Sequence, residues 1–568
     1  MEVKSIFENL FKKNGENGDS GYAPKFLIKK PGVPVEFPKK IDIRNVNIIY
    51  PLIEPFAYAN IKWNPDFKEL VYNLIEPELD ENDEEILKNV SQGIIELVDV
   101  ELTSIRNPTN AVEYLEKNFI KVLKEFGLKL TPEQYPKIMY YIYRDFIGYN
   151  EIEPLMRDPT IEDISCDGIG TPIYIIHRKF GSLKTSIVFR DPEVLREFVV
   201  KLAERSGRYV SYAEPILDGT LTDGSRVSAT IAGDVATRGP VFTIRKFGEK
   251  PFSPIELVEL GTVSIDILAY LWYLVEHGAS MLLVGGTATG KTSLLNSVCM
   301  FIPPEAKIVS IEDTREIRIP HEHWSPGLAR TGFGMPLSTG EKYGGISLFD
   351  LLKESFRQNP DYVIVGETRG AEASVMFQGM SSGHVCLSTF HAGSLDTLVK
   401  RLITPPIELA PTLVESLDVV ILMIHAREKG KSARRVKEVI EIEAVDSKTN
   451  EVRTKKIFMW NPAKDTFERV EDSIKLGKFA VEIGGSLEEA MQDIENRRRV
   501  LEWMKENKIR DYKEVAKYIN LYYKEPEKLL KLIERPFSAE VKIERPHEKK
   551  SRFSSIFEML GFKVVKEK

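Results

Sequence analysis

The sequence predicts an α/β protein with a mainly parallel central sheet and helices on both of its faces, preceded by a smaller α+β domain. Three observations support this fold class. From 255 to 470, short apolar runs alternate with helical patterns, and buried parallel strands have such near-continuous runs. From 151 to 248, shorter strand patterns are separated by Asp-Gly turns. Helical apolar spacing dominates the flanking regions, which predicts helical extensions at both ends.

Changes in residue composition and in the spacing of apolar residues divide the chain into segments. One segment is a linker with two prolines in six residues. The predicted segments are a flexible lead with a short amphipathic helix at 1–60, a helical subdomain at 61–150, the α+β domain at 151–248, the linker at 249–254, the sheet domain at 255–470 and a helical extension at 471–568. The strands expected in the sheet domain are 281–284, 307–311, 362–365, 385–389 and 419–424, with hairpins at its edge from 439 to 470.

Composition excludes several classes of protein. The chain has 568 residues, of which 42% are hydrophobic and 29% charged, as is usual for a folded soluble protein. A net charge of −7 does not favour nucleic acid as a partner. No apolar run is long enough to span a membrane, the N-terminus does not resemble a secretory signal, and the three cysteines are too far apart for a CxxC zinc site. We therefore expect a cytoplasmic protein.

Both ends of the chain carry a short apolar segment. Residues 5–11 have helical apolar spacing and are followed by Lys12 and Lys13, and residues 556–562 resemble them. The first segment predicts either a helix that binds a membrane surface or a partner, or a short helix packed on the protein's own core.

One motif predicts a phosphate-binding loop. Its glycines let successive backbone N–H groups point at phosphate oxygens, and the following helix adds its positive N-terminal end. A lysine then supplies charge to the β- and γ-phosphates, and the next hydroxyl coordinates Mg²⁺. An apolar strand before the loop and an apolar-periodic helix after it make a chance match improbable. The expected ATP-binding residues are Gly285, Gly286, Thr287, Ala288, Thr289, Gly290, Lys291, Thr292 and Ser293, with Thr292 as a Mg²⁺ ligand.

Acidic residues end two of the predicted strands. Glu367 ends the run 362–365 after Gly366, where a carboxylate faces the crevice in which a nucleotide lies. It is expected to hold Mg²⁺ through water or to activate the attacking water. Glu312 and Asp313 end the run 307–311, and because successive strand residues alternate in direction, at most one of them should point directly at the metal.

Two of the eight histidines flank one strand. Because seven positions separate them, His384 and His391 do not form adjacent metal ligands, and contact with the γ-phosphate is favoured over zinc binding. For His384 a structural role remains an equal alternative.

Four segments in this order, GGTATGKT, IEDTREIRIPH, YVIVGETRG and GHVCLSTFHAGS, resemble the secretion ATPase superfamily of type II and type IV secretion and type IV pilus assembly. The segments HEHWSPGLARTGFG and DVATRGPVFTIRKF look most like its archaeal branch, which includes the archaellum motor ATPase. The resemblance covers about 140–470. Unlike many bacterial relatives, this chain has no CxxC…CxxC zinc module.

The resemblance implies a RecA-like domain that binds ATP and Mg²⁺, a homohexameric ring, and arginines that reach the phosphates from the N-terminal domain. The matching positions are Arg226, Arg238 and Arg245. It also implies that Glu367 is the catalytic glutamate, Glu312 an Asp-box acid that positions water or metal, and His391 a His-box residue. A loop at 336–345 is expected to be mobile and near the site.

The predicted function is Mg²⁺-dependent ATP hydrolysis by a ring-shaped motor. It would act on the cytoplasmic side of the membrane, through a polytopic platform protein, to assemble or move an archaellum, type IV pilus or secretion filament. Two alternatives are a RecA-like nucleic-acid motor, which the acidity of the chain disfavours, and a nucleotide-gated scaffold without hydrolysis, which has no need of Glu367.

Overall fold

The computed structural model describes residues 26–29, 42–97, 108–231, 233–247, 250–330, 332–336, 342–428, 431–446 and 451–534. The chain divides into two compact units, Met1–Glu249 and Lys250–Lys568, and each is described by itself below. The apolar segments expected at 5–11 and 556–562 lie outside the described residues, as do residues 337–341 of the loop expected to be mobile.

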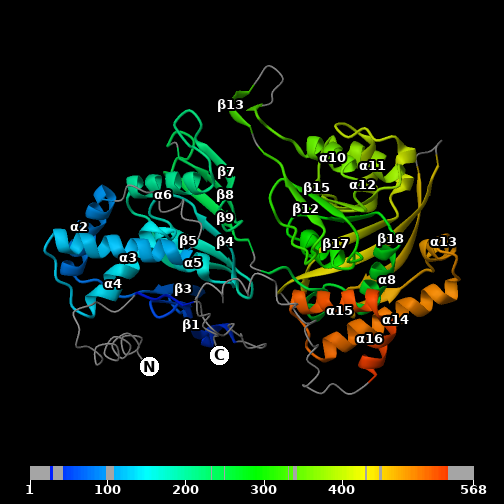
Figure 1. Ribbon diagram of the computed structural model, residues 1–568, viewed down its shortest axis with the longest axis horizontal. Helices are drawn as coiled ribbons and strands as arrows, with labels where there is room; N and C mark the ends of the chain where they lie inside the picture. Colours follow the sequence, from blue (N-terminus) through cyan, green and yellow to red (C-terminus); the bar gives the residue numbers. More distant parts are fainter. Residues whose placement is uncertain are drawn as a thin grey trace, which may run out of the picture. The chain divides into compact units, whose positions relative to one another are not determined.

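The first unit is built on a mixed sheet with helices packed on it (Figure 1). Within the described residues the strand order is β1-β2-β3-β6-β5-β4-β9-β8-β7, antiparallel except where β3 pairs with β6. Its strands are β1 (Asn47–Ile53), β2 (Ala57–Asn64), β3 (Glu69–Ile75), β4 (Ile161–Cys166), β5 (Pro172–His177), β6 (Gly181–Val188), β7 (Ile216–Thr220), β8 (Arg226–Thr230) and β9 (Val241–Arg245). Its α-helices are α2 (Glu81–Leu97), α3 (Pro108–Glu125), α4 (Gln134–Phe146), α5 (Glu153–Arg157) and α6 (Pro192–Arg205).

The start of this sheet was not predicted. A flexible lead was expected up to residue 60 and helix after it, but β1, β2 and β3 form an antiparallel meander there. That expectation came from the charge, glycine and proline of segments such as GENGDSG and KKPGVPVEFPKK, which precede β1. Pro51 lies within β1, at the edge of the sheet, where the N–H that proline lacks is not needed for a second partner. The helical prediction holds from α2 onward.

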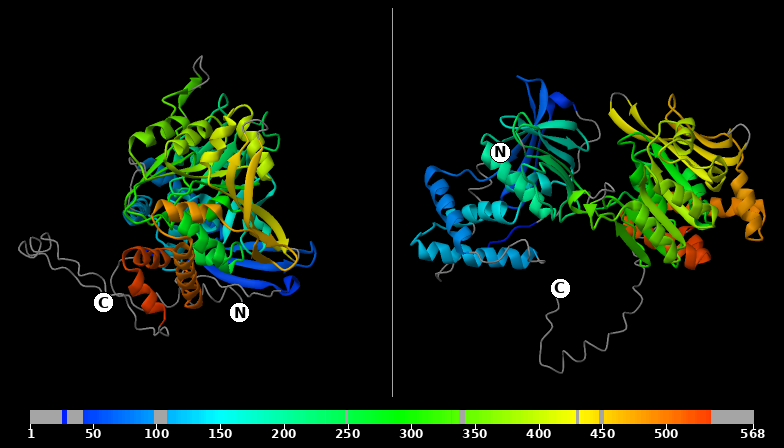
Figure 2. Two further views of the ribbon diagram at one scale, coloured as in Figure 1. Left: turned by 90° about the vertical axis from the view of Figure 1, so that its right-hand side faces the viewer. Right: turned by 90° about the horizontal axis from the view of Figure 1, so that it is seen from above.

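The second unit contains the predicted parallel sheet. Its order within the described residues is β12-β11-β15-β16-β10-β17-β18-β19-β20, parallel up to β17 and antiparallel beyond it. The strands are β10 (Met281–Gly285), β11 (Ile308–Glu312), β12 (Trp324–Leu328), β15 (Tyr362–Thr368), β16 (Val385–Phe390), β17 (Val419–Glu428), β18 (Lys431–Val445), β19 (Val452–Asn461) and β20 (Thr466–Arg469), and β13 (Phe333–Pro336) pairs with β14 (Lys342–Tyr343) separately. The predicted edge hairpins are confirmed as the ribbon β18–β20, yellow to orange in Figure 2.

Helices cover both faces of this sheet, which explains why its strands are apolar without alternation. Leu283 and Ile364 pack in one core with α8 (Ile265–Glu276) and α9 (Lys291–Cys299), and Leu282 and Val363 pack in another. The second core contains α10 (Leu348–Arg357), α11 (Glu372–Ser381) and α12 (Leu395–Ile403). The three layers bring the carboxyl ends of β10, β15 and β16 to one edge of the sheet.

The C-terminal extension packs on α8 as the helices α13 (Ile474–Glu482), α14 (Leu487–Glu506), α15 (Tyr512–Lys524) and α16 (Pro526–Ile533), and α7 (Pro254–Glu259) begins the unit. Arg497 of α14 is 2% exposed, pairs with Glu276 and lies 5.2 Å from the ring centre of Trp272. This buried arginine joins the extension firmly to the sheet layer. In the part of the chain that the structure describes, no helix combines the length and apolar character needed to cross a bilayer.

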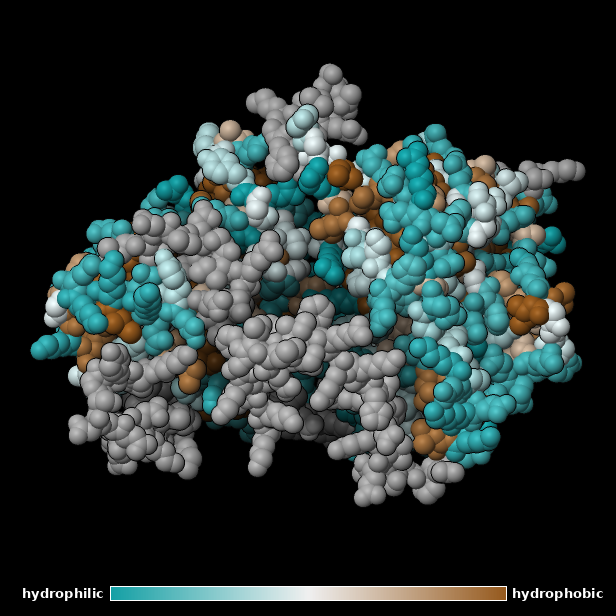
Figure 3. Space-filling view, viewed as in Figure 1, coloured by the Kyte–Doolittle hydropathy of each residue, from teal (hydrophilic) through white to brown (hydrophobic). Residues whose placement is uncertain are grey.

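One exposed apolar patch lies in this extension. The turn from α13 to α14 exposes Val481, Ile483, Leu487 and Met491, and Figure 3 shows brown surface where α13 lies. Contiguous exposed apolar side chains of this kind are typical of contact surfaces.

Candidate active site

The predicted phosphate-binding loop lies between β10 and α9. Gly285 ends the strand, and α9 begins at Lys291, so the intervening backbone turns through 286–290. Thr289 Oγ1 donates to the carbonyl of Gly286 at 2.9 Å, which closes the turn. Thr292 and Ser293 occupy the first turn of α9 and are half-buried. The strand, loop and helix thus have the arrangement that the motif requires.

Two glycines of the loop are required by its geometry. A Cβ on Gly285 would lie 2.7 Å from the carbonyl oxygen of Met423 on β17, so a larger residue would push the loop from the sheet. Gly290 caps α9 in the left-handed region, with φ 90°, where a side chain is strained. With Gly290 in this conformation, α9 begins with the N–H groups of its first turn directed toward the space enclosed by the phosphate-binding loop.

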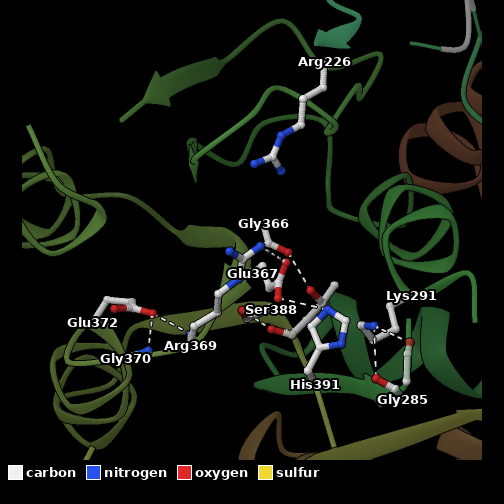
Figure 4. A network of polar contacts seen from close by, with 12 residues as sticks. Arg226, Gly285, Lys291, Gly366, Glu367, Arg369, Gly370, Glu372, Ser388 and His391 are labelled. Carbon is white, nitrogen blue, oxygen red and sulfur yellow. Dashed lines mark hydrogen bonds and ion pairs between the residues drawn. The ribbon is translucent and has the colours of Figure 1, made fainter. Parts of the chain in front are cut away.

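Lys291 lies over the loop rather than in solvent. It is 7% exposed, and its Nζ donates to the carbonyl of Gly285 at 3.1 Å and of Gly286 at 2.8 Å (Figure 4). Burial lowers the pKa of this amine from its ordinary value. A desolvated ammonium group whose hydrogen bonds go to these two carbonyls is well placed to exchange them for the charge of a phosphate.

Glu367 lies at the carboxyl end of β15, between two basic side chains. Arg369 donates from Nη2 to Oε2 at 2.6 Å, and Nε2 of His391 lies 3.0 Å from Oε1 (Figure 4). His391 directly follows β16, the strand between β15 and β10. Residues from the ends of two neighbouring strands therefore meet at this carboxylate.

The electrostatics join this cluster to the loop. Burial raises the pKa of Glu367, but Arg369, His391 and Lys291 outweigh burial and hold that pKa below its ordinary value. The pKa of His391 is lowered by burial and then by the charge of Lys291. At neutral pH we therefore expect an ionised Glu367 and a neutral His391 that donates to it. The structure brings together three predicted residues, Lys291, Glu367 and His391.

Glu312 lies outside this hydrogen-bonded cluster. It is 2% exposed at the end of β11, and its Oε1 accepts the backbone N–H groups of Glu316 and Ile317 at 2.7 and 2.8 Å. A Cβ on Gly366 would lie 3.0 Å from its Cγ, so Glu312 packs directly beside the strand that carries Glu367. Through these hydrogen bonds the carboxyl group of Glu312 fixes the backbone of residues 316 and 317, which follow β11.

Burial raises the pKa of Glu312 to about 7, with partial compensation from the two backbone N–H groups. Because the folded-state pKa exceeds the ordinary 4.5, Glu312 lowers stability as the pH rises from 4.5 through 7. The substitution Glu312→Gln keeps the oxygen that accepts the two N–H groups but cannot ionise. At a pH above 7 it should therefore raise the free energy of unfolding by about 3 kcal/mol relative to wild type. Urea unfolding at pH 5 and pH 8 should show a variant whose gain in stability over wild type is much larger at the higher pH. The exposed control Glu305→Gln should show no such gain, and a pH-independent difference for Glu312→Gln would contradict the assignment.

The other predicted acid and histidine are placed differently. Asp313 follows β11 and is exposed. His384 precedes β16 while His391 follows it, so about 20 Å of strand separates them. His384 makes an edge contact with Phe356, with ring centres 4.7 Å apart. Of the two histidines, His391 alone shares an edge of the sheet with the loop.

The predicted arginines all lie in the first unit. Arg226 on β8 and Arg245 on β9 are direct cross-strand partners and are both exposed. Arg226 pairs with Asp218 at 3.0 Å, and Nε of Arg245 lies 3.5 Å from Asp163. Each of the two guanidinium groups thus has a carboxylate partner, which offsets the repulsion expected between like charges directly opposite on a sheet. Arg238 lies in the segment before β9, where its carbonyl accepts the N–H of Ile169.

Sequence reasoning missed two basic residues of the cluster. Arg369 follows Glu367 by two positions at the end of a strand, and this spacing in the sequence was a usable indication that both point the same way. Arg401 on α12 donates to the carbonyl of His391 and lies 5.0 Å from the ring centre of Phe390. The hydrogen bond of Arg401 connects α12 to the end of β16, and no local sequence pattern indicates that these two segments meet.

Comparison with known proteins gives relatives in archaea and bacteria. An uncharacterized protein of Methanocaldococcus jannaschii, MJ0900, is 36% identical over 504 residues, which is 85% of this chain and 90% of that protein. The type IV secretion system protein PtlH of Bordetella pertussis is 33% identical over 181 residues, 29% of this chain and 50% of that protein. The X-ray structure of the Legionella pneumophila ATPase DotB matches 69% of this chain and 95% of its own with 15% identity and a TM-score of 0.36.

The family model described as "Type II/IV secretion system protein" matches residues 149–528. This range contains the loop at 285–293, the Glu367 cluster and the arginine pair of the first unit. It also extends past the sheet into the helices of the C-terminal extension. The chain belongs to the type II/IV secretion system protein family, with a RecA-like P-loop domain as its second unit.

Proposed function

We propose that this protein hydrolyses ATP in the presence of Mg²⁺ at the loop 285–293 and uses the free energy to drive a secretion, pilus or archaellum filament. The observation that carries the proposal is the approach of Glu367 and His391 to Lys291 at one edge of the sheet. A phosphate-binding loop alone would suffice for a protein that only binds nucleotide. A phosphate-binding loop with an ionised carboxylate beside it also has a group that can activate water for hydrolysis.

The residues of the loop fit a bound Mg²⁺–triphosphate. Gly285 keeps the backbone against Met423, and Lys291 is buried against carbonyls that phosphate oxygens can replace. Thr292 would hold Mg²⁺ directly and Glu367 would hold it through water. The metal ion supplies neutralisation of phosphate charge. These assignments rest on residue types and positions at the head of α9 and the end of β15.

The chain's own groups then account for the reaction. Backbone N–H groups of the loop and Lys291 orient the phosphates, and Glu367 accepts a proton from the attacking water. A bond forms between the water oxygen and the γ-phosphorus, while the bond between the γ-phosphorus and the bridging oxygen breaks and ADP leaves. Arg369 and His391 hold the carboxylate in place through its two oxygens, which restricts it to one orientation.

Arg226, Arg238 and Arg245 are proposed to neutralise charge that develops on the γ-phosphoryl group. Such arginines accelerate other nucleotidases by about 10³–10⁵. Arg226→Ala and Arg245→Ala should each lower kcat at least about tenfold while the Kd for ADP changes little. Steady-state ATPase assays and nucleotide titrations test this expectation. The control is Arg196→Ala, an exposed arginine on α6 that pairs with Glu193. Unchanged kcat in both variants would remove Arg226 and Arg245 from the mechanism.

We further propose that the working form is a homohexameric ring at the cytoplasmic face of the membrane, in contact with a polytopic platform protein. Membership of the secretion family supports this assembly. The name of PtlH refers to a type IV secretion system, which agrees with the same class of role. The exposed apolar turn between α13 and α14 is a surface available for such contacts.

The proposal is tested with purified full-length protein. Phosphate release from ATP should require Mg²⁺, and particles should form rings in negative-stain images with a nonhydrolysable ATP analogue. Anionic vesicles should raise turnover, because the motor acts at a membrane surface. Absence of Mg²⁺-dependent hydrolysis under all these conditions would contradict the proposal. Stimulation by single-stranded DNA with salt-dependent binding would favour the nucleic-acid motor instead.

A further inference from the structure

An arginine of strand β18 contacts the phosphate-binding loop within the same unit. Arg434 lies on β18, the first antiparallel strand beyond β17, and its Nε donates to the carbonyl oxygen of Ala288 at 3.0 Å. A Cβ on Gly290 would lie 3.2 Å from Cδ of Arg434. The arginine therefore lies along the outer side of the loop, touching it at its apex and near its end.

The contact holds a strained part of the loop. Ala288 has φ 58°, in the left-handed region that residues with a Cβ rarely adopt. Its carbonyl points out of the loop toward Arg434 because of this conformation, and a charged donor stabilises it there. Loss of that donor would let Ala288 relax toward an ordinary conformation and move the N–H groups next to it.

Arg434 is presented by a rigid element. The next residue, Arg435, is 3% exposed and forms two hydrogen bonds of 2.8 Å with the carboxylate of Asp465. Arg435 also donates to the carbonyl of Arg434 at 3.0 Å, which fixes the backbone at that position. In addition, β18 pairs with β17, whose Met423 carbonyl lies against Gly285 at the start of the loop. Both ends of the loop are thus braced by one hairpin.

We propose that Arg434 is a nucleotide-positioning residue that holds the apex of the loop in the conformation that accepts the phosphates of a nucleoside triphosphate. The inference rests on the proposed function of the same loop. Arg434 acts on binding, through Ala288, whereas Glu367 acts on the chemical step. Its removal should therefore raise KM and Kd together and leave kcat nearly unchanged.

The test compares Arg434→Ala and Arg434→Lys with wild type in titrations with a fluorescent ADP analogue and in steady-state ATPase assays. Arg434→Ala should weaken ADP binding about tenfold, the size expected for one charge-assisted hydrogen bond. Its kcat should stay within about twofold. Arg434→Lys, which keeps a cation but not the planar Nε–H donor, should lie between Ala and wild type.

A matched control separates this effect from general damage to the hairpin. Lys437 lies on the same strand and pairs with Glu438 at 3.3 Å, so Lys437→Ala removes a cation from β18 without touching the loop. It should bind ADP as wild type does. An Arg434→Ala variant with wild-type affinity, or one that loses kcat rather than affinity, would overturn the inference. Failure of the wild-type protein to bind ADP would instead contradict the proposed function itself.

Discussion

Replacing Glu367 by Gln is expected to lower kcat for ATP about 10³-fold while nucleotide still binds, because the amide cannot accept a proton from water. Affinity for ATP should be retained or increased, since a negative charge near Lys291 is removed. In wild type, the pKa of Glu367 lies below its ordinary 4.5, so this group stays ionised from pH 6 to 8. Ionisation of Glu367 should therefore cause no loss of turnover across that range. Phosphate release and nucleotide titrations at several pH values measure both effects.

The matched control for this variant is Glu354→Gln. Glu354 lies on α10, is 57% exposed at its side chain and pairs with Arg357, so it offers the same chemical change on the surface. It should hydrolyse ATP at the wild-type rate. Substantial turnover by Glu367→Gln would show that another group activates the water, and the role given to Glu367 would be wrong.

The second large effect is expected for Lys291→Ala, which should weaken ATP and ADP binding about 10²-fold or more and abolish turnover at millimolar ATP. The variant loses the ammonium group that Gly285 and Gly286 now hold, and with it two or more charge-assisted hydrogen bonds to phosphate. Equilibrium titration with a fluorescent ADP analogue measures the loss.

Thermal unfolding distinguishes this loss from misfolding. Because burial lowers the pKa of Lys291, its charged form is disfavoured in the fold, and removal of the amine should not reduce the Tm. Lys478→Ala is the control, since Lys478 is an exposed residue of α13 that pairs with Glu482. Tight ADP binding by Lys291→Ala would contradict the placement of the phosphates in this loop.

Local patterns were sufficient to predict the elements that build the site. The apolar runs before Gly285 and Glu367 are strands β10 and β15, because strands buried on both faces cannot be polar on either side. The loop follows from its own glycines, whose backbone requirements are local. His391 was also predictable, since it follows an apolar run of the same sheet.

The missed features depend on contacts between distant parts of the chain. Pro51 lies inside strand β1, and the position of β1 at a sheet edge, which no local pattern indicates, explains how it is accommodated. Arg434 reaches Ala288 across 146 positions, and nothing in its sequence neighbourhood separates it from Arg435, which is buried against Asp465. Glu312 looked like Glu367 in the sequence, since both end apolar strands, yet backbone N–H groups of 316 and 317 occupy its carboxylate.

A crystal structure of the protein with Mg²⁺ and ADP–beryllium fluoride would test the central claim most directly. We predict that the β-phosphate lies against the N–H groups of residues 286–292, that Lys291 has exchanged its carbonyl partners for phosphate oxygens, and that a single water bridges Glu367 to the beryllium fluoride group. A nucleotide bound elsewhere, or a Glu367 too far from the terminal group for one water to join them, would contradict it.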